Sequence, residues 1–262
     1  GRLSSSNPNL QNIPIRDDEG KVLRKIFVAR EGNVFIDADY SQIELRLLAH
    51  FSGCKELIDA YKEEKDVHAT TAAQVFGVPF EEVTSKMRRE AKAVNFGIIY
   101  GISDFGLARN LNISTAKAKA YIEKYFETYS SIKDYMNANV EFAKANGYVS
   151  TLTGRKRVIP EIKSPNYNIR QFGERAAMNM PLQGSSADII KIAMVNVDKA
   201  LKEEGLKAKL ILQVHDELVI EAPEEEAERA AAILKDKMEN AVSLKVPLTV
   251  EVHTGKNWYE AK

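Results

Sequence analysis

Residues 210–222 have the sequence LILQVHDELVIEA, in which two short apolar runs flank His215, Asp216 and Glu217. Two strand-like runs this close together predict a tight antiparallel hairpin. An ordinary hairpin turn would use Gly, Asn or Pro at its tip. An imidazole and two adjacent carboxylates cost desolvation energy beside an apolar sheet, and a divalent metal ion would compensate for that cost. A solvated turn that happens to be acidic is the alternative interpretation.

The composition of the 262 residues predicts an ordinary soluble globular protein, with 44% hydrophobic and 28% charged residues. The one cysteine, Cys54, excludes an internal disulfide and is compatible with a reducing compartment. No apolar run is long enough for a membrane span or a signal-peptide core, so we expect no membrane partner. The formal net charge is zero, so any binding of nucleic acid must depend on local clusters of charge.

The pattern along the chain predicts an α+β fold, in which an antiparallel sheet with helices carries an inserted, mostly helical subdomain. A helix is expected after residue 40, with Ser41 as its N-cap and Glu44 as the third-position partner of a capping box. Breaks in the helical middle are expected near Gly53, Gly77, Gly101 and Asn112. The other expected segments are an extended polar start (1–20), strands (34–40, 148–159, 248–253) and helices (55–145, 169–204, 224–241).

Asp39 lies at the end of the predicted strand 34–40, immediately before a helix. If that strand lies beside the hairpin, Asp39 and Asp216 can converge on the same ions. Two carboxylates that bridge two magnesium ions are the standard apparatus of phosphoryl transfer. Asp39 could instead be a plain helix-start acid. Asp37 would share a face with Asp39 in a regular strand, and we interpret it as a strand-edge charge in solvent.

Four residues in the segment 86–101 recur at every fourth position: Arg88, Lys92, Phe96 and Tyr100. On a helix they form one gently spiralling row, in which two cations precede two aromatic rings. Such a row could pair with a triphosphate and offer a stacking surface to a nucleoside. Gly97 lowers helix propensity by about 1 kcal/mol relative to Ala, which would make sense if a ligand or base approaches closely. A basic solvent face that grades into a buried aromatic stripe is the alternative.

Several other polar residues have no obvious structural role. Three of them repeat every four residues along a predicted helix and could reach base edges or sugars in a minor groove. Individually, each could be an ordinary surface residue, and His68 reads as a neutral histidine within a helix. The polar residues are Arg2, Asn9 and Gln11 in the extended start and Arg175, Asn179 and Gln183 on the helix.

Three segments, in this order, resemble the signature motifs of family A DNA polymerases. They are residues 39–46 (DYSQIELR), residues 88–101 with Arg88, Lys92, Asn95-Phe96-Gly97 and Tyr100-Gly101, and residues 213–217 (QVHDE). Residues 1–5, 8–14 and 181–188 resemble further segments of the family. The resemblance covers essentially the whole chain and is to the C-terminal palm and fingers part of the bacterial members.

The resemblance implies a role for each matching residue. Asp39 and Asp216 would bind two Mg²⁺ ions, for which Mn²⁺ would substitute, with the carbonyl of Tyr40 completing the site and Glu217 as an auxiliary acid. Arg88 and Lys92 would hold the incoming triphosphate, and Lys92 would also protonate the leaving pyrophosphate. His68 and Gln42 would support the phosphates, Phe96 would pack on the sugar and base, Tyr100 would occupy the templating position, and Glu44 would exclude ribonucleotides. The residues implied to line the primer–template are Arg2, Asn9, Gln11, Arg175, Asn179, Gln183 and His215.

The resemblance also implies the domains and the activity. Residues 1–50 and 169–262 would form the palm and residues 51–168 the fingers, whereas the thumb and exonuclease-like domain of a full member would precede Gly1 in a parent chain. The implied function is template-directed DNA synthesis from deoxynucleoside triphosphates in replication or repair, in the bacterial cytoplasm at the nucleoid. The alternatives are a two-metal nuclease and a non-catalytic DNA-binding fragment.

Overall fold

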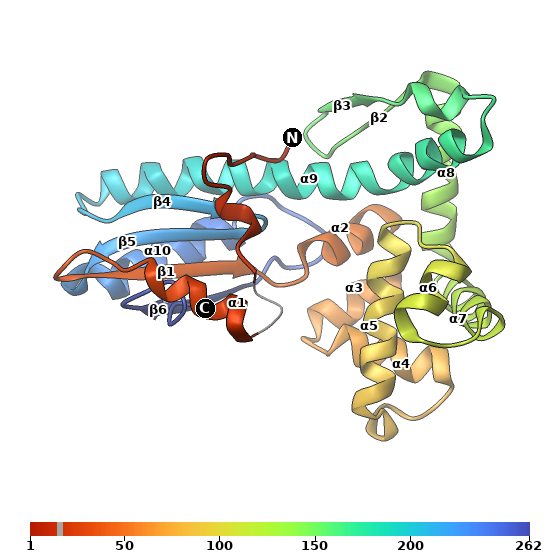
Figure 1. The fold of residues 1–262 in the computed structure, drawn as a ribbon, viewed down its shortest axis with the longest axis horizontal. Coiled ribbons are helices and arrows are strands. Elements are labelled where there is room, and N and C mark those ends of the chain that lie inside the picture. Colours follow the sequence, from red (N-terminus) through yellow and green to blue (C-terminus); the bar gives the residue numbers. More distant parts are fainter. Residues whose placement is uncertain (15–17) are drawn as a thin grey trace. The chain divides into compact units, whose positions relative to one another are not determined.

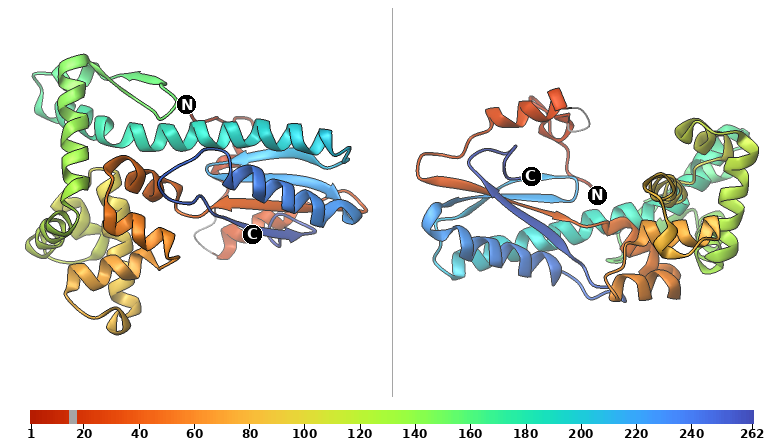
Figure 2. Two further views of the ribbon diagram at one scale, coloured as in Figure 1. Left: turned by 180° about the vertical axis from the view of Figure 1, so that it is seen from behind. Right: turned by 90° about the horizontal axis from the view of Figure 1, so that it is seen from below.

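The structure, a computed structural model, describes residues 1–14 and 18–262 (Figures 1 and 2). Its internal contacts divide the chain into two compact units. Unit 1 consists of Gly1–Ile43, Ser186–Ser243 and Leu248–Lys262, and unit 2 consists of Glu44–Ser185 and Leu244–Pro247. The expected extended start (1–20) includes residues 15–17, which lie outside the described residues. The described part of that start is irregular, except for the 3-10 helix η1 (Leu10–Asn12) and the first residues of helix α1 (Asp18–Val22).

Unit 1 is built on a four-stranded antiparallel sheet with the order β4-β5-β1-β6. The strands are β1 (Asn33–Tyr40), β4 (Lys209–Val214), β5 (Glu217–Pro223) and β6 (Val250–Gly255). The predicted hairpin and the predicted first strand are therefore confirmed, and the last strand begins two residues later than predicted. Because β1 lies between β5 and β6, both of its edges are hydrogen-bonded.

The two faces of β1 pack against different parts of unit 1. The Tyr40 hydroxyl donates to the Met238 carbonyl of helix α10 (Ala227–Glu239) at 2.6 Å, so the even-numbered residues of β1 face that helix. On the other face, Phe35 packs with Trp258, Val214 and Val219. Asp37 and Asp39 therefore point to the same side of the sheet as Trp258.

Helix α9 (Tyr167–Glu203) begins in unit 2 and ends in unit 1, and it is visible as the long helix in Figure 1. Pro181 lies inside it and cannot donate a backbone hydrogen bond. The Ser185 hydroxyl donates to the carbonyl of Pro181 at 2.5 Å. Besides η1 and α1, the short elements of unit 1 are the 3-10 helices η2 (Leu23–Ile26) and η5 (Glu224–Glu226).

Unit 2 is mainly helical, as predicted for the middle of the chain. Its predicted breaks occur at Gly53, Gly77, Gly101 and Asn112, each of which has a positive φ that ends regular helix geometry. Its helices are α2 (Ile43–Ser52), α3 (Lys55–Lys62), α4 (Val67–Phe76), α5 (Ser85–Ile99), α6 (Asp104–Leu111), α7 (Thr115–Thr128) and α8 (Ser130–Asn146), with the 3-10 helices η3 (Phe80–Glu82) and η4 (Pro160–Lys163) and the hairpin β2 (Tyr148–Ser150) and β3 (Lys156–Val158).

The start of α2 differs from the prediction. The helix begins at Ile43, so Gln42, with φ +56°, directly precedes it, rather than Ser41. The Glu44 carboxylate accepts a hydrogen bond from Tyr100 at 2.7 Å, a tertiary contact that the capping-box pattern did not reveal. No helix of the described residues is both long and apolar enough to cross a bilayer.

Candidate functional site

The end of β1 lies beside the tip of the hairpin in unit 1. Asp39 is directly opposite Glu217 in the register of the two strands, and the Tyr40 N–H donates to the Asp216 carbonyl at 3.1 Å. The Asp39 side chain is partly exposed, whereas Glu217 is buried. The sheet therefore places the backbones of Asp39, Tyr40 and Asp216 together at one end of its strands, as the convergence of the two acids requires.

Two residues at this end of the sheet have left-handed backbone torsions. Gln42, just after β1, has φ +56°, and His215, at the hairpin tip, has φ +52°. A non-glycine residue in this region costs about 1–2 kcal/mol. The Gln213 side chain donates to the His215 carbonyl at 2.5 Å and helps to hold the turn. Retained strain of this kind is typical of functional sites.

The buried side of the acidic cluster is formed by residues distant in sequence. The indole N–H of Trp258 donates to Asp37 Oδ2 at 3.2 Å and to Glu217 Oε1 at 2.9 Å. Arg24 Nη1 lies 3.4 Å from the same Glu217 oxygen, with its guanidinium 4.0 Å above the Trp258 ring. The Lys262 ammonium bonds Asp39 Oδ2 at 3.2 Å and also bonds Glu217 Oε2.

The interpretation of Asp37 as a solvent-exposed charge was wrong. Asp37 is 2% exposed, because Trp258 covers its side chain on that face of the sheet and β5 and β6 flank β1 on both sides. Burial and the neighbouring Glu217 charge raise the pKa of Asp37 to about 8. Burial would also raise the pKa of Glu217, but the Lys262 ammonium beside it lowers that pKa below its usual value. Asp37 is therefore the protonated member of the pair at neutral pH.

The donor atoms at this end of the sheet fit a hard divalent cation. Asp39 and Asp216 offer carboxylate oxygens and Tyr40 offers a carbonyl oxygen, the ligand types that Mg²⁺ prefers. Burial raises the pKa of Asp39, and the Lys262 charge opposes that rise. In the described part of the chain, no three His, Cys, Asp or Glu side chains are grouped to hold a metal ion.

The predicted DNA-contacting residues of unit 1 lie in the N-terminal segment (Arg2, Asn9 and Gln11) and at the hairpin tip (His215). The Asn9 side chain accepts from the Gln11 N–H and caps η1, and the Gln11 amide lies 3.4 Å from the Gln213 carbonyl of β4. Gln11 is thus close to the strand that leads to His215. Arg2 is exposed in the segment that precedes η1.

In unit 2, the predicted row follows one side of α5. Arg88 and Lys92 are exposed, Phe96 is half-buried, and Tyr100 directly follows the helix. Arg88 Nε donates to Asp66 Oδ2 at 2.5 Å. The other oxygen of Asp66 caps α4 by accepting the N–H groups of His68 and Ala69. Although partial burial would raise the pKa of Asp66, Arg88 and these N–H groups lower it.

His68 is buried in a polar network. Its Nδ1 lies 3.1 Å from the Asn95 amide, which also donates to the Thr71 hydroxyl at 3.1 Å. Burial lowers the pKa of His68 to about 4, so the ring is neutral at pH 7, as predicted. The centroids of the His68 and Phe96 rings are 5.8 Å apart.

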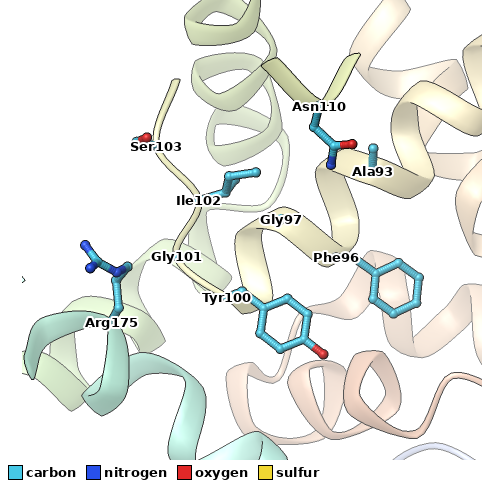
Figure 3. Close-up of a pocket in the computed structure, with 9 residues that line it drawn as sticks. All are labelled: Ala93, Phe96, Gly97, Tyr100, Gly101, Ile102, Ser103, Asn110 and Arg175. Atoms are coloured by element: carbon cyan, nitrogen blue, oxygen red, sulfur yellow. The ribbon is translucent and has the colours of Figure 1, made fainter. Parts of the chain in front are cut away.

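A cavity of about 630 Å³ opens beside the end of α5 (Figure 3). It is lined by the aromatic pair Phe96 and Tyr100, by the 101–103 loop and by Arg175. A Cβ on Gly97 would lie 2.6 Å from Ile102 Cγ2, so the close neighbour of this glycine is a side chain of the protein itself. The predicted reason for Gly97, approach of a ligand, is therefore not needed to explain it.

The predicted polar row of α9 begins at this cavity. Arg175 lines it, and a Cβ on Gly101 would lie 3.0 Å from Arg175 Cγ. The Asn179 amide is 3.4 Å from the Ile99 carbonyl at the end of α5, and Gln183 is half-buried one turn further along. Arg175 and Asn179 thus lie beside the row of α5.

Several residues that contact the predicted site residues were not identified from the sequence. Asp66 could have been found, because an acid before an apolar helix is a common N-cap. Asn95 lies inside the motif of residues 88–101, but its sequence context does not indicate that it would bind His68. Trp258 and Lys262 have no local signal, since they reach the cluster only through closure of the sheet.

The fold is that of a family of nucleotide-polymerising enzymes. Residues 1–260 match the model of DNA polymerase family A, and the chain belongs to that family. This membership confirms the resemblance seen in the sequence.

The chain is similar to DNA polymerase I of Caldicellulosiruptor bescii (60% identity over 262 residues) and of Lactococcus lactis subsp. cremoris (56% over 263 residues), in each case over 100% of this chain. It covers 31% and 30% of those two proteins, so it spans about a third of their length. A solved structure of the polymerase domain of Pol1 from M. smegmatis, in complex with DNA primer-template and dNTP, aligns with a TM-score of 0.96 and 47% identity, over 100% of this chain and 46% of that one. This likeness confirms the α+β fold class.

Proposed function

We propose that this chain carries out template-directed DNA synthesis, adding deoxynucleotides to a primer 3′-hydroxyl with release of pyrophosphate. The observation that carries the proposal is that the backbones of Asp39, Tyr40 and Asp216 lie together at one end of the strands β1 and β5. Membership of family A and the likeness to a polymerase solved with primer-template and dNTP support it. Outside the nucleic acid and the nucleotide, the expected partners are the thumb and exonuclease-like domains of a longer parent chain.

Asp39, Asp216 and the Tyr40 carbonyl would hold the two Mg²⁺ ions, and Mn²⁺ could replace them because it accepts the same oxygen donors. Bound there, such ions lower the pKa of a hydroxyl and neutralise charge on phosphates. Glu217, buried and ionised, is an auxiliary acid: it keeps Trp258 and Lys262 in place behind Asp39.

The row on α5 would bind the nucleotide. Arg88 would exchange its Asp66 contact for a phosphate, and Lys92, exposed one turn later, would hold the triphosphate and donate a proton to the leaving pyrophosphate. Phe96 would pack on the sugar and base, with neutral His68 behind it and with Gln42 as a second polar group toward the phosphates. Glu44 and Tyr100, hydrogen-bonded to each other, would exclude a ribose 2′-hydroxyl and occupy the templating position.

Residues 1–50 and 169–262 would serve as the palm and residues 51–168 as the fingers. The DNA would contact unit 1 through Arg2, Asn9, Gln11 and His215, and the α9 row Arg175, Asn179 and Gln183 would reach its minor groove. By analogy with the bacterial relatives, we expect the protein at the nucleoid in the cytoplasm, in repair or replication.

Single-nucleotide primer extension with Mg²⁺ tests this proposal. Asp216→Ala should abolish incorporation, while Asp198→Ala, which removes an exposed acid of α9 paired with Lys202, should leave it unchanged. Lys92→Met should lower the rate by about 10²–10⁴-fold, the range for loss of a general acid. Magnesium-dependent hydrolysis of DNA that survives in Lys92→Met would indicate a nuclease instead. DNA binding without incorporation under any metal would indicate a non-catalytic fragment.

A further inference from the structure

The acidic cluster behind the candidate metal site already contains cations of its own. Three carboxylates, those of Asp37, Asp39 and Glu217, face one side of the sheet, and Lys262 and Arg24 lie among them. Asp39 and Glu217 each have a cation beside them, so neither carboxylate depends on a divalent ion for a positive neighbour.

The two cations have different neighbours. Glu217 keeps Arg24 and Trp258 as partners whatever Lys262 does. Among the residues that the structure describes, Lys262 is the cation that contacts Asp39. The Lys262 ammonium therefore occupies a position beside the Asp39 carboxylate that a bound metal ion would need.

Lys262 also has space to move. Its side chain is 30% exposed, and it lines a cavity of about 350 Å³ together with Lys21, Arg24 and Tyr259. A shift of the ammonium into this cavity would break its contact with Asp39. The flexible stem of a lysine allows such a shift, which the charge of an entering metal ion would favour and the charges of Lys21 and Arg24 would oppose.

We propose that Lys262 is a resident counter-ion of the metal site, which bonds Asp39 and Glu217 in the metal-free protein and leaves Asp39 when a divalent cation binds. This inference rests on the proposed role of Asp39 as a metal ligand. Lys262 acts as a positioning residue: it holds Asp39 close to its binding position and prevents repulsion between Asp39 and Glu217. The contact that it makes with Asp39 must be given up each time a metal ion enters.

The test is a titration of the DNA-free protein with Mn²⁺, followed by the electron paramagnetic resonance signal of the free ion. Lys262→Gln should bind Mn²⁺ about tenfold more tightly, because it removes both a competing contact and a like charge beside the ion. Lys262→Arg keeps the charge and should bind as the unchanged protein does. Lys256→Gln is the matched control, because Lys256 also pairs with a carboxylate, that of Glu224, on the surface.

A second readout is thermal unfolding. Without metal, Lys262→Gln should melt about 2–4 °C below the unchanged protein, and Mg²⁺ should raise its melting temperature by more than it raises that of the unchanged protein. Both effects should be absent in Lys256→Gln.

Two outcomes separate the two proposals. If Asp39→Asn abolishes tight Mn²⁺ binding but Lys262→Gln leaves the affinity unchanged or weakened, the counter-ion proposal is overturned and the metal site stands. If Asp39→Asn binds Mn²⁺ as the unchanged protein does, the assignment of Asp39 as a ligand fails, and the counter-ion proposal fails with it. Neither measurement depends on DNA synthesis.

Discussion

At the scale of single residues, His68 shows how burial fixes a protonation state that a binding site can use. The imidazole is 2% exposed, and the Asn95 amide lies beside its Nδ1. A neutral ring in this position can pack near Phe96 without placing a charge in the core of unit 2. The surrounding network therefore determines the chemistry of His68 more than its position in the sequence does.

His68 should make the free energy of unfolding depend on pH. Its pKa in the fold is about 4, below the ordinary value of 6.5, so the unfolded chain binds the extra proton first. The contribution of His68 is complete above pH 6.5 and is lost as the pH falls toward 4, by at most about 1.4 kcal/mol per pH unit. Urea unfolding from pH 4 to 7.5 should show a weaker pH dependence in His68→Gln.

The matched control for this experiment is the exposed His253, since His253→Gln should keep the pH dependence of the unchanged protein. An identical slope in His68→Gln and the unchanged protein would contradict the prediction. It would mean that His68 titrates alike in the folded and unfolded chain.

At the scale of elements, local pattern predicted most of the fold. The 210–222 stretch formed its hairpin, and the glycine and asparagine breaks of unit 2 fell where the sequence indicated. These signals are local, because a turn or a helix end depends on the torsions of a few residues. The buried state of Asp37 could not be predicted in this way, because the residue that covers it, Trp258, is 221 positions away.

Helix α5 offers a test of tight packing at an element boundary. Gly97→Ala should destabilise the fold by about 1–2 kcal/mol, because the new methyl group would lie 2.6 Å from Ile102 Cγ2. The gain in helix propensity, about 1 kcal/mol, offsets part of the clash. Urea unfolding measures the net effect.

A double-mutant cycle isolates the clash. In an Ile102→Ala background, Cγ2 is absent, so Gly97→Ala should become neutral or stabilising by up to about 1 kcal/mol. An equal effect of Gly97→Ala in both backgrounds would show that Ile102 is not the reason for the glycine.

At the scale of the whole molecule, charge predicts how DNA would be held. The chain has 37 basic and 37 acidic residues, so long-range attraction to DNA is weak and affinity depends on a few local contacts. The motifs of the candidate site could be identified from the sequence because the residues of each motif are close together in the chain. The residues that contact those motifs from elsewhere could not be identified, since Lys262 and Asp39, for example, are 223 positions apart.

Arg175→Gln should weaken binding of primer–template DNA about tenfold at every salt concentration, because the proposed contact is to the groove and not to a phosphate. Plots of log affinity against log salt from fluorescence anisotropy should therefore be parallel. Lys199→Gln, which removes an exposed cation of the same helix paired with Glu203, should leave affinity unchanged. A slope that falls by about 0.9 would instead identify a phosphate contact.

The strand order β4-β5-β1-β6 has a consequence for synthesis of the chain on the ribosome. β1 is followed by about 180 residues before β5, the first of its two neighbours to be made, and by about 210 residues before β6. At about 5–20 residues per second, its apolar residues wait roughly 10–35 s for a partner. All but four residues of unit 2 emerge during that interval. Unit 2 should thus fold while β1 is still unpaired, and chaperone contacts on the nascent chain should concentrate on residues 33–40.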